Sequence, residues 1–133
     1  MAVSPVLVDS SFYIRLLRKG QDPLRALALT AASRDLAVCG IVRCEVGRGL
    51  QEHRVLKRFQ AFWNAMICVP TDESIWNSVE ETLWQLNRKG VMLPLPDVVI
   101  ACCARKIGAT VLTADAHFGL IPGIEVIQRL EIR

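Results

Sequence analysis

Short apolar runs alternate along the chain with longer segments in which apolar residues recur every three or four positions. Five of the short runs have the length of a strand, and we expect strands at Pro5 to Val8, Leu36 to Ile41, Met66 to Val69, Ala109 to Leu112 and Ile124 to Ile127. Two helical segments fill each of the first three intervals. Continuous apolar strands separated by helices are typical of parallel sheets that are covered on both faces. The pattern therefore predicts a three-layer α/β/α domain with a central parallel sheet of four to five short strands. No linker or repeat interrupts it, so we expect one domain over residues 1–133.

The segment from residue 93 to residue 118, LPLPDVVIACCARKIGATVLTADAHF, contains two acids at the ends of predicted elements. Pro94 and Pro96 bias the chain away from the α region, so we expect the helix to begin at Asp97. This helix ends in basic residues, and the apolar strand after it ends in Thr113-Ala114-Asp115. Both carboxylates are thus expected at the rim of the sheet, where parallel α/β folds place their ligands.

Four carboxylates share this position at the end of an apolar run or the beginning of a helix: Asp9, Glu45, Asp97 and Asp115. Each one alone is explained by helix capping or by exposure on a helix face. Together, at the carboxyl edge of one sheet, they would repel one another by roughly 4 kcal/mol for each pair at 4 Å and an effective dielectric of about 20. Retained protons or a bound cation would relieve that repulsion. Oxygen ligands of this kind suit Mg²⁺ or Mn²⁺, which activates water for attack on phosphodiesters.

Composition limits the cellular setting and the partners. Hydrophobic residues make up 52% of the chain and the mean hydropathy is +0.32, so some apolar surface is expected to meet a partner. We expect no membrane span and no signal peptide, because charges and prolines break every apolar run and the N-terminus lacks a basic region. The five cysteines lack C-x-x-C spacing, which favours buried thiols in a reducing cytoplasm. The net charge of +3 permits a polyanionic partner.

The chain resembles the PIN-domain nucleases, and among them the VapC-type toxins of toxin–antitoxin pairs. The matching segments are VLVDSSFYI, IVRCEVGRGL, LPDVVIACCARKIGATVLTADAHF and the final IEVI, which together extend over almost the whole chain. The order and spacing of these segments carry the resemblance, since each motif alone is weak.

The resemblance implies a magnesium-dependent endoribonuclease, with Mn²⁺ as the alternative ion. Its acidic metal ligands and catalytic residues would be Asp9, Glu45, Asp97 and Asp115. Ser10 and Thr113 would orient these carboxylates through hydrogen bonds. The resemblance also implies an RNA substrate, a cognate antitoxin that covers apolar helices, and a homodimer in the cytoplasm. Members of the family often carry a further acid or polar residue shortly after the fourth acid, where this chain has Ala116-His117-Phe118.

Other polar and aromatic residues have simpler interpretations. We expect His117 to pack or to form hydrogen bonds within its loop, with a role at the phosphate or as a proton donor to the leaving oxygen as the alternative. Trp63, Trp76 and Trp84 are expected in the core or an interface rather than as platforms for bases. The basic residues of one helix, Arg48, Arg54, Lys57 and Arg58, are expected to be solvated, with contact to an RNA backbone as the alternative.

Two other functions are alternatives to the nuclease. Phosphoryl transfer through an aspartyl intermediate would call for an acid two residues after Asp9 or for a receiver-type set of acids, and the chain has Ser10-Ser11 there. A non-catalytic PIN-like module that binds a protein would have no need of the four acids. Such a module would not respond to magnesium or to a chelator.

Overall fold

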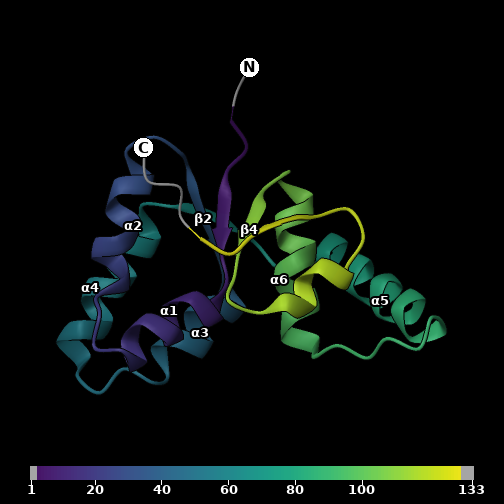
Figure 1. The fold of residues 1–133 in the computed structure, drawn as a ribbon, viewed down its shortest axis with the longest axis horizontal. Helices are drawn as coiled ribbons and strands as arrows, with labels where there is room; N and C mark the ends of the chain where they lie inside the picture. The colour runs from purple at the N-terminus through teal and green to yellow at the C-terminus, as the bar shows by residue number, and fades with distance from the viewer. Residues whose placement is uncertain (1–2, 130–133) are drawn as a thin grey trace.

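The computed structural model describes residues 3–129 and consists of one parallel sheet between two layers of helices (Figure 1). The strands are β1 (Val6–Val8), β2 (Leu36–Cys39), β3 (Ile67–Val69), β4 (Thr110–Leu112) and β5 (Glu125–Ile127). Their order in the sheet is β3-β2-β1-β4-β5, and every pair is parallel. The prediction of a three-layer α/β/α domain is confirmed.

Six α-helices connect the strands. They are α1 (Ser10–Arg18), α2 (Pro23–Ala31), α3 (Gly40–Gly47), α4 (His53–Asn64), α5 (Glu73–Arg88) and α6 (Leu95–Lys106), and a 3-10 helix, η1 (Ala116–Leu120), lies between β4 and β5. Figure 1 shows α5 and α6 on one side of the sheet and α1, α2 and α4 on the other. Helix α3 packs against α1, α4 and α6, and thereby joins the two sides at one edge of the sheet.

The three central strands are apolar on both faces because both faces are covered. Every residue of β1, β2 and β4 except Thr110 is apolar, and all are buried. The outer strands β3 and β5 are partly exposed. The order of the strands reverses direction at β1, since β2 follows it on one side and β4 lies on the other. Sheets of this kind bind ligands outside the carboxyl ends of the strands at such a reversal.

Strands β1, β3, β4 and β5 each begin one residue later than predicted, and two further boundaries differ for a reason that the structure shows. The second strand ends at Cys39 rather than Ile41, because Gly40 begins α3. Helix α6 begins at Leu95 rather than Asp97. Pro96 lies in the first turn, where a proline costs no hydrogen bond because the first amides of a helix have no partner within it.

The exposure of several side chains bears on the predictions. Trp63 lies in the core, buried against Tyr13, as expected. Trp76 and Trp84 are 42% and 57% exposed and are not core residues, so their place in an interface stays a prediction. Cys44 and Cys68 are exposed, although buried thiols were expected, and all five cysteines are free. The predicted basic residues are solvated, but Arg48 ends α3 and does not belong to the α4 helix that carries the others.

Within residues 3–129, no helix combines the length and the apolar character that crossing a membrane requires.

Candidate active site

Asp9 follows the central strand β1 and lies almost completely buried, with 2% of its surface exposed. It occupies the N-cap position of α1, yet its side chain makes no capping hydrogen bond. Its Oδ2 instead accepts hydrogen bonds from Ser11 Oγ at 2.6 Å and from Thr113 Oγ1 at 2.8 Å. The usual structural reason for an aspartate at this position is therefore absent. The carboxylate is held by one hydroxyl from the first turn of α1 and one from the residue after β4.

Thr113 connects the end of β4 to two of the acids. Its hydroxyl donates to Asp9 and accepts a hydrogen bond from the backbone N–H of Asp115 at 2.9 Å. The backbone N–H of Asp9 donates in turn to the carbonyl of Leu112 at 2.8 Å. These contacts fix the end of β1 against the end of β4, as the parallel register of the two strands requires.

Glu45 lies on α3 and is linked to the first acid through Ser10. Ser10 Oγ donates to Glu45 Oε1 at 2.7 Å, and Asp9 Oδ1 lies 3.4 Å from the same hydroxyl. A serine hydroxyl carries one proton, so the shorter contact takes it. Ser10 therefore orients Glu45 more than it orients Asp9. The sequence interpretation did not single out Ser11, although Asp9-Ser10-Ser11 places a second hydroxyl two residues after the acid.

Asp97 lies in the first turn of α6 and is half-buried. Its pKa is raised to about 6, first because burial disfavours the charged form and then because of the negative charges of Asp9, Asp115 and Glu45. The three other predicted carboxylates are thus close enough to Asp97 to oppose its ionisation. Convergence of the four acids was the feature that the sequence pattern could not establish.

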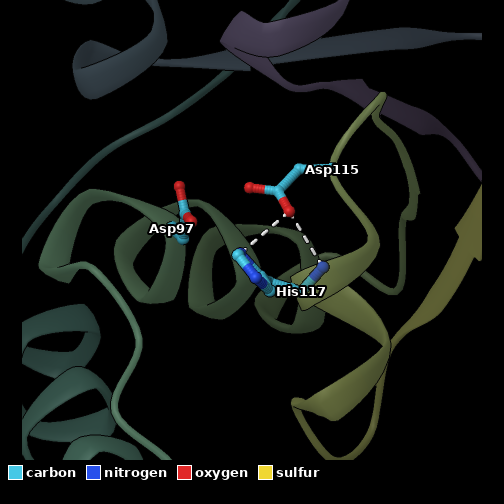
Figure 2. Close-up of side chains that lie close together, drawn as sticks. All are labelled: Asp97, Asp115 and His117. Atoms are coloured by element: carbon cyan, nitrogen blue, oxygen red, sulfur yellow. Dashed lines mark hydrogen bonds and ion pairs between the residues drawn. The ribbon is translucent and has the colours of Figure 1, made fainter.

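Asp115 and His117 complete the site from the loop that follows β4. Asp115 Oδ1 accepts the backbone N–H of His117 at 2.9 Å and lies 3.0 Å from His117 Nδ1. Figure 2 shows Asp97 on α6 and Asp115 on its loop on opposite sides of a small space, with the imidazole of His117 beside both. The expectation that His117 forms hydrogen bonds within its loop is confirmed.

One ligand atom from each of Asp97, Asp115 and His117 lies within 4.8 Å of the other two, a spacing that suits a metal ion. Asp9 and Glu45 do not belong to this group. The donor set fits a divalent cation, because two carboxylates and an imidazole are common metal ligands and two further carboxylates add negative charge nearby. A cation would also relieve the repulsion that raises the pKa of Asp97.

Fold and site together define a parallel α/β domain that gathers carboxylates at the reversal point of its sheet. The family model of the PIN domain matches residues 6–123, and the chain therefore belongs to the PIN domain family. No curated protein sequence matches the chain significantly.

Solved structures share the fold at low sequence identity. A chain in the crystal structure of VapBC2 from Rickettsia felis, bound to a DNA fragment from its promoter, matches with a TM-score of 0.75 and 19% identity, over 92% of this chain and 97% of that one. A chain of DNA-bound VapBC from Salmonella typhimurium matches with a TM-score of 0.74 and 21% identity, over 94% of this chain and 98% of that one. VapC20 from Mycobacterium tuberculosis is described as a toxin that cleaves the sarcin-ricin loop. It matches with a TM-score of 0.67 and 19% identity, over 91% of this chain and 98% of that one.

Proposed function

We propose that this protein is a divalent-metal-dependent endoribonuclease and the toxin of a type II toxin–antitoxin pair. One observation carries the proposal: Asp9, Glu45, Asp97 and Asp115 come together from four separate segments of the chain, and burial together with the negative charges of the other three raises the pKa of Asp97. Such a concentration of carboxylates costs stability, and perturbed pKa values of this kind cluster at functional sites. Membership of the PIN domain family and a fold shared with a toxin described as cleaving the sarcin-ricin loop support the same conclusion.

In this proposal, Asp9, Glu45, Asp97 and Asp115 are the catalytic residues and the metal ligands. The hydroxyls of Ser10 and Thr113 orient Glu45 and Asp9 through the contacts at 2.7 Å and 2.8 Å. Ser11 adds a donor to Asp9 and also accepts the backbone N–H of Ala114, so it fixes the loop that carries Asp115. When bound, Mg²⁺ or Mn²⁺ supplies a water of lowered pKa and a positive charge for the phosphoryl oxygens.

Cleavage of labelled RNA by the purified protein tests the proposal. Reactions contain Mg²⁺, Mn²⁺ or EDTA, and a DNA strand of the same sequence serves as the second substrate. We expect cleavage of RNA with either metal and none with EDTA, and we expect Asp97→Asn to be inactive. Asp35→Asn is the matched control, because Asp35 is exposed and its replacement removes the same charge away from the site. Cleavage that persists in EDTA, or in Asp97→Asn, would contradict the assignment.

The toxin role predicts an antitoxin partner. Chains of similar fold occur in VapBC from Salmonella typhimurium, in FitAB and in a toxin–antitoxin complex from Klebsiella pneumoniae. We propose that an antitoxin covers partly exposed apolar side chains of α1, α2 and α4, among them Phe12, Leu29 and Phe62. Cytoplasmic expression of the wild-type chain alone should stop growth, and Asp97→Asn should not. Equal growth arrest by both chains would contradict toxicity through RNA cleavage.

A homodimer is a further part of this proposal. Light scattering during gel filtration should give about twice the chain mass of 14.8 kDa. A mass of one chain across the concentration range of the growth and cleavage assays would exclude the dimer.

A non-catalytic module that binds a protein is the second candidate. An exposed apolar pocket of about 310 Å³ favours it, lined by Leu83 and Trp84 of α5 and by Val91, Met92 and Leu93 of the following loop. The two candidates differ in their response to metal. A binding module predicts that calorimetric titration detects no Mn²⁺ binding that depends on Asp97. The nuclease requires Mn²⁺ binding at Asp97.

A further inference from the structure

His117 is the one residue of the candidate metal group that offers nitrogen rather than oxygen. We propose that the imidazole of His117 is a direct ligand of the metal ion, and that it shifts the preference of the site from magnesium toward manganese and the later transition metals. The inference rests on the metal site of the proposed function, but its test does not require RNA cleavage.

One contact with Asp115 positions the imidazole, and a buried neighbour holds the backbone that carries it. Asp115 Oδ1 receives the backbone N–H of His117 at 2.9 Å and lies 3.0 Å from its ring nitrogen Nδ1. Phe118, the next residue, is fully buried in the core and anchors η1. The imidazole is therefore held beside the carboxylate of Asp115 rather than being free to leave the site, although 61% of the side chain is exposed.

The spacing of the three ligand atoms suits coordination. They lie within 4.8 Å of one another, whereas ligand atoms on opposite sides of Mg²⁺, bonded at about 2.1 Å, are roughly 4.2 Å apart. A shift of a few tenths of an ångström in the exposed His117 and the half-buried Asp97 and Asp115 closes that difference. Figure 2 shows the ring beside both Asp97 and Asp115, as a shared ion between the three side chains would require.

A purely structural role would account poorly for the same contacts. An ion pair between Asp115 and His117 is a partly exposed pair with side-chain exposures of 30% and 61%, and pairs of this kind contribute little to stability. The backbone N–H of His117 already bonds to the Asp115 side chain without any need for an imidazole. The ring thus adds little to the fold, and what it adds to the site is a nitrogen donor.

The choice of nitrogen has a consequence for the metal. Imidazole suits zinc, copper, iron and nickel, whereas carboxylate and water ligands suit magnesium and manganese. Affinity for a nitrogen-containing site also rises along the series from manganese through cobalt to nickel. Loss of the imidazole should therefore weaken cobalt and nickel binding strongly, manganese binding less, and magnesium binding least.

The test uses the metals alone with the purified protein. Pulsed electron paramagnetic resonance of bound Mn²⁺ reports directly coordinated ¹⁴N, and the chain has two histidines, His53 and His117. We expect a nitrogen signal in the wild type, its loss in His117→Gln, and its persistence in His53→Gln. His53 begins α4 and is exposed, so it is the matched control. Calorimetry should show about a tenfold or greater loss of Co²⁺ affinity in His117→Gln, with Mg²⁺ affinity changed by less than about threefold.

The outcomes separate this inference from the nuclease proposal. RNA cleavage by wild-type protein with Mn²⁺, together with no nitrogen signal from bound Mn²⁺, would overturn the role of His117 and leave the nuclease standing. A nitrogen signal that His117→Gln abolishes, in protein that cleaves no RNA, would support the ligand and overturn the nuclease. Equal losses of Co²⁺ and Mg²⁺ affinity in His117→Gln would also overturn the inference, since they indicate a general disturbance of the site.

Discussion

Replacing Asp97 by asparagine should stabilise the metal-free protein above pH 6 while it removes the proposed activity. In the folded chain the pKa of Asp97 is about 6, compared with 3.8 for an unperturbed aspartate. Between these values the folded state binds more protons than the unfolded state, so the stability that Asp97 contributes decreases as the pH rises. It is fully present below about pH 4 and is lost as the pH passes through about 6. An asparagine side chain does not ionise and avoids that loss.

The magnitude follows from the shift of about two pKa units. At 1.36 kcal/mol for each unit, the full shift corresponds to about 3 kcal/mol. Asp97 is half-exposed, and solvent screening weakens interactions at such sites. We therefore expect Asp97→Asn to raise the free energy of unfolding by about 1–2 kcal/mol at pH 7.5, and to leave it nearly unchanged at pH 4.

Urea unfolding in EDTA, followed by far-UV circular dichroism between pH 4 and pH 8, measures this difference. Asp35→Asn is the control for loss of one negative charge at an exposed position. Added Mg²⁺ should reverse the order, because it stabilises only the chain that binds it, by about 2.7 kcal/mol at 100 times the dissociation constant. A variant that is less stable than wild type in EDTA at pH 7.5, or a difference that does not change with pH, would refute the reasoning.

Three further substitutions test the contacts that hold the site and the core, each by urea unfolding. Thr113→Val removes a buried hydroxyl that donates to Asp9 and should lower the free energy of unfolding by about 1–3 kcal/mol. Thr113→Ser keeps the hydroxyl and should retain most of that stability. Equal losses in both variants would contradict the role of the hydroxyl. Asp22→Ala removes the side chain that caps α2 and should lower the free energy of unfolding by about 1 kcal/mol. Asp22→Asn should be nearly as stable as the wild type. An alanine variant as stable as the wild type would show that the cap contributes nothing. Tyr13→Phe leaves the buried indole N–H of Trp63 without its acceptor at 3.2 Å and should lower the free energy of unfolding by about 1–3 kcal/mol. An unchanged midpoint of the urea transition would mean that the indole finds another partner.

The fold could be predicted from the sequence because its signals are local. Strands β1, β2 and β4 are buried on both faces, and all their residues except Thr110 are therefore apolar. Errors arose where one local rule overrode another. Proline usually bars the preceding residue from a helix, but Leu95 precedes Pro96 inside α6, because the first turn of a helix needs no amide from proline.

The site could be predicted only in part, because its geometry depends on contacts between distant segments. The position of Asp9 after an apolar run is visible in the sequence, and so is the alternative that it caps a helix. Only the structure shows that its side chain bonds to Ser11 and Thr113 instead of capping α1. The proximity of His117 to Asp97, which lies on another element, has no signal in the local pattern at all.

The most direct test of the central claim is the rate of RNA cleavage by four single variants and one double variant with Mg²⁺. The single variants are Asp9→Asn, Glu45→Gln, Asp97→Asn and Asp115→Asn, and the double variant combines the changes at Asp97 and Asp115. If the four carboxylates act as one unit on the charge of the reacting phosphate, each single change should lower the rate by at least about 100-fold. The double variant should then be little worse than either single one. Full activity in any single variant, or losses that multiply in the double variant, would contradict a shared site.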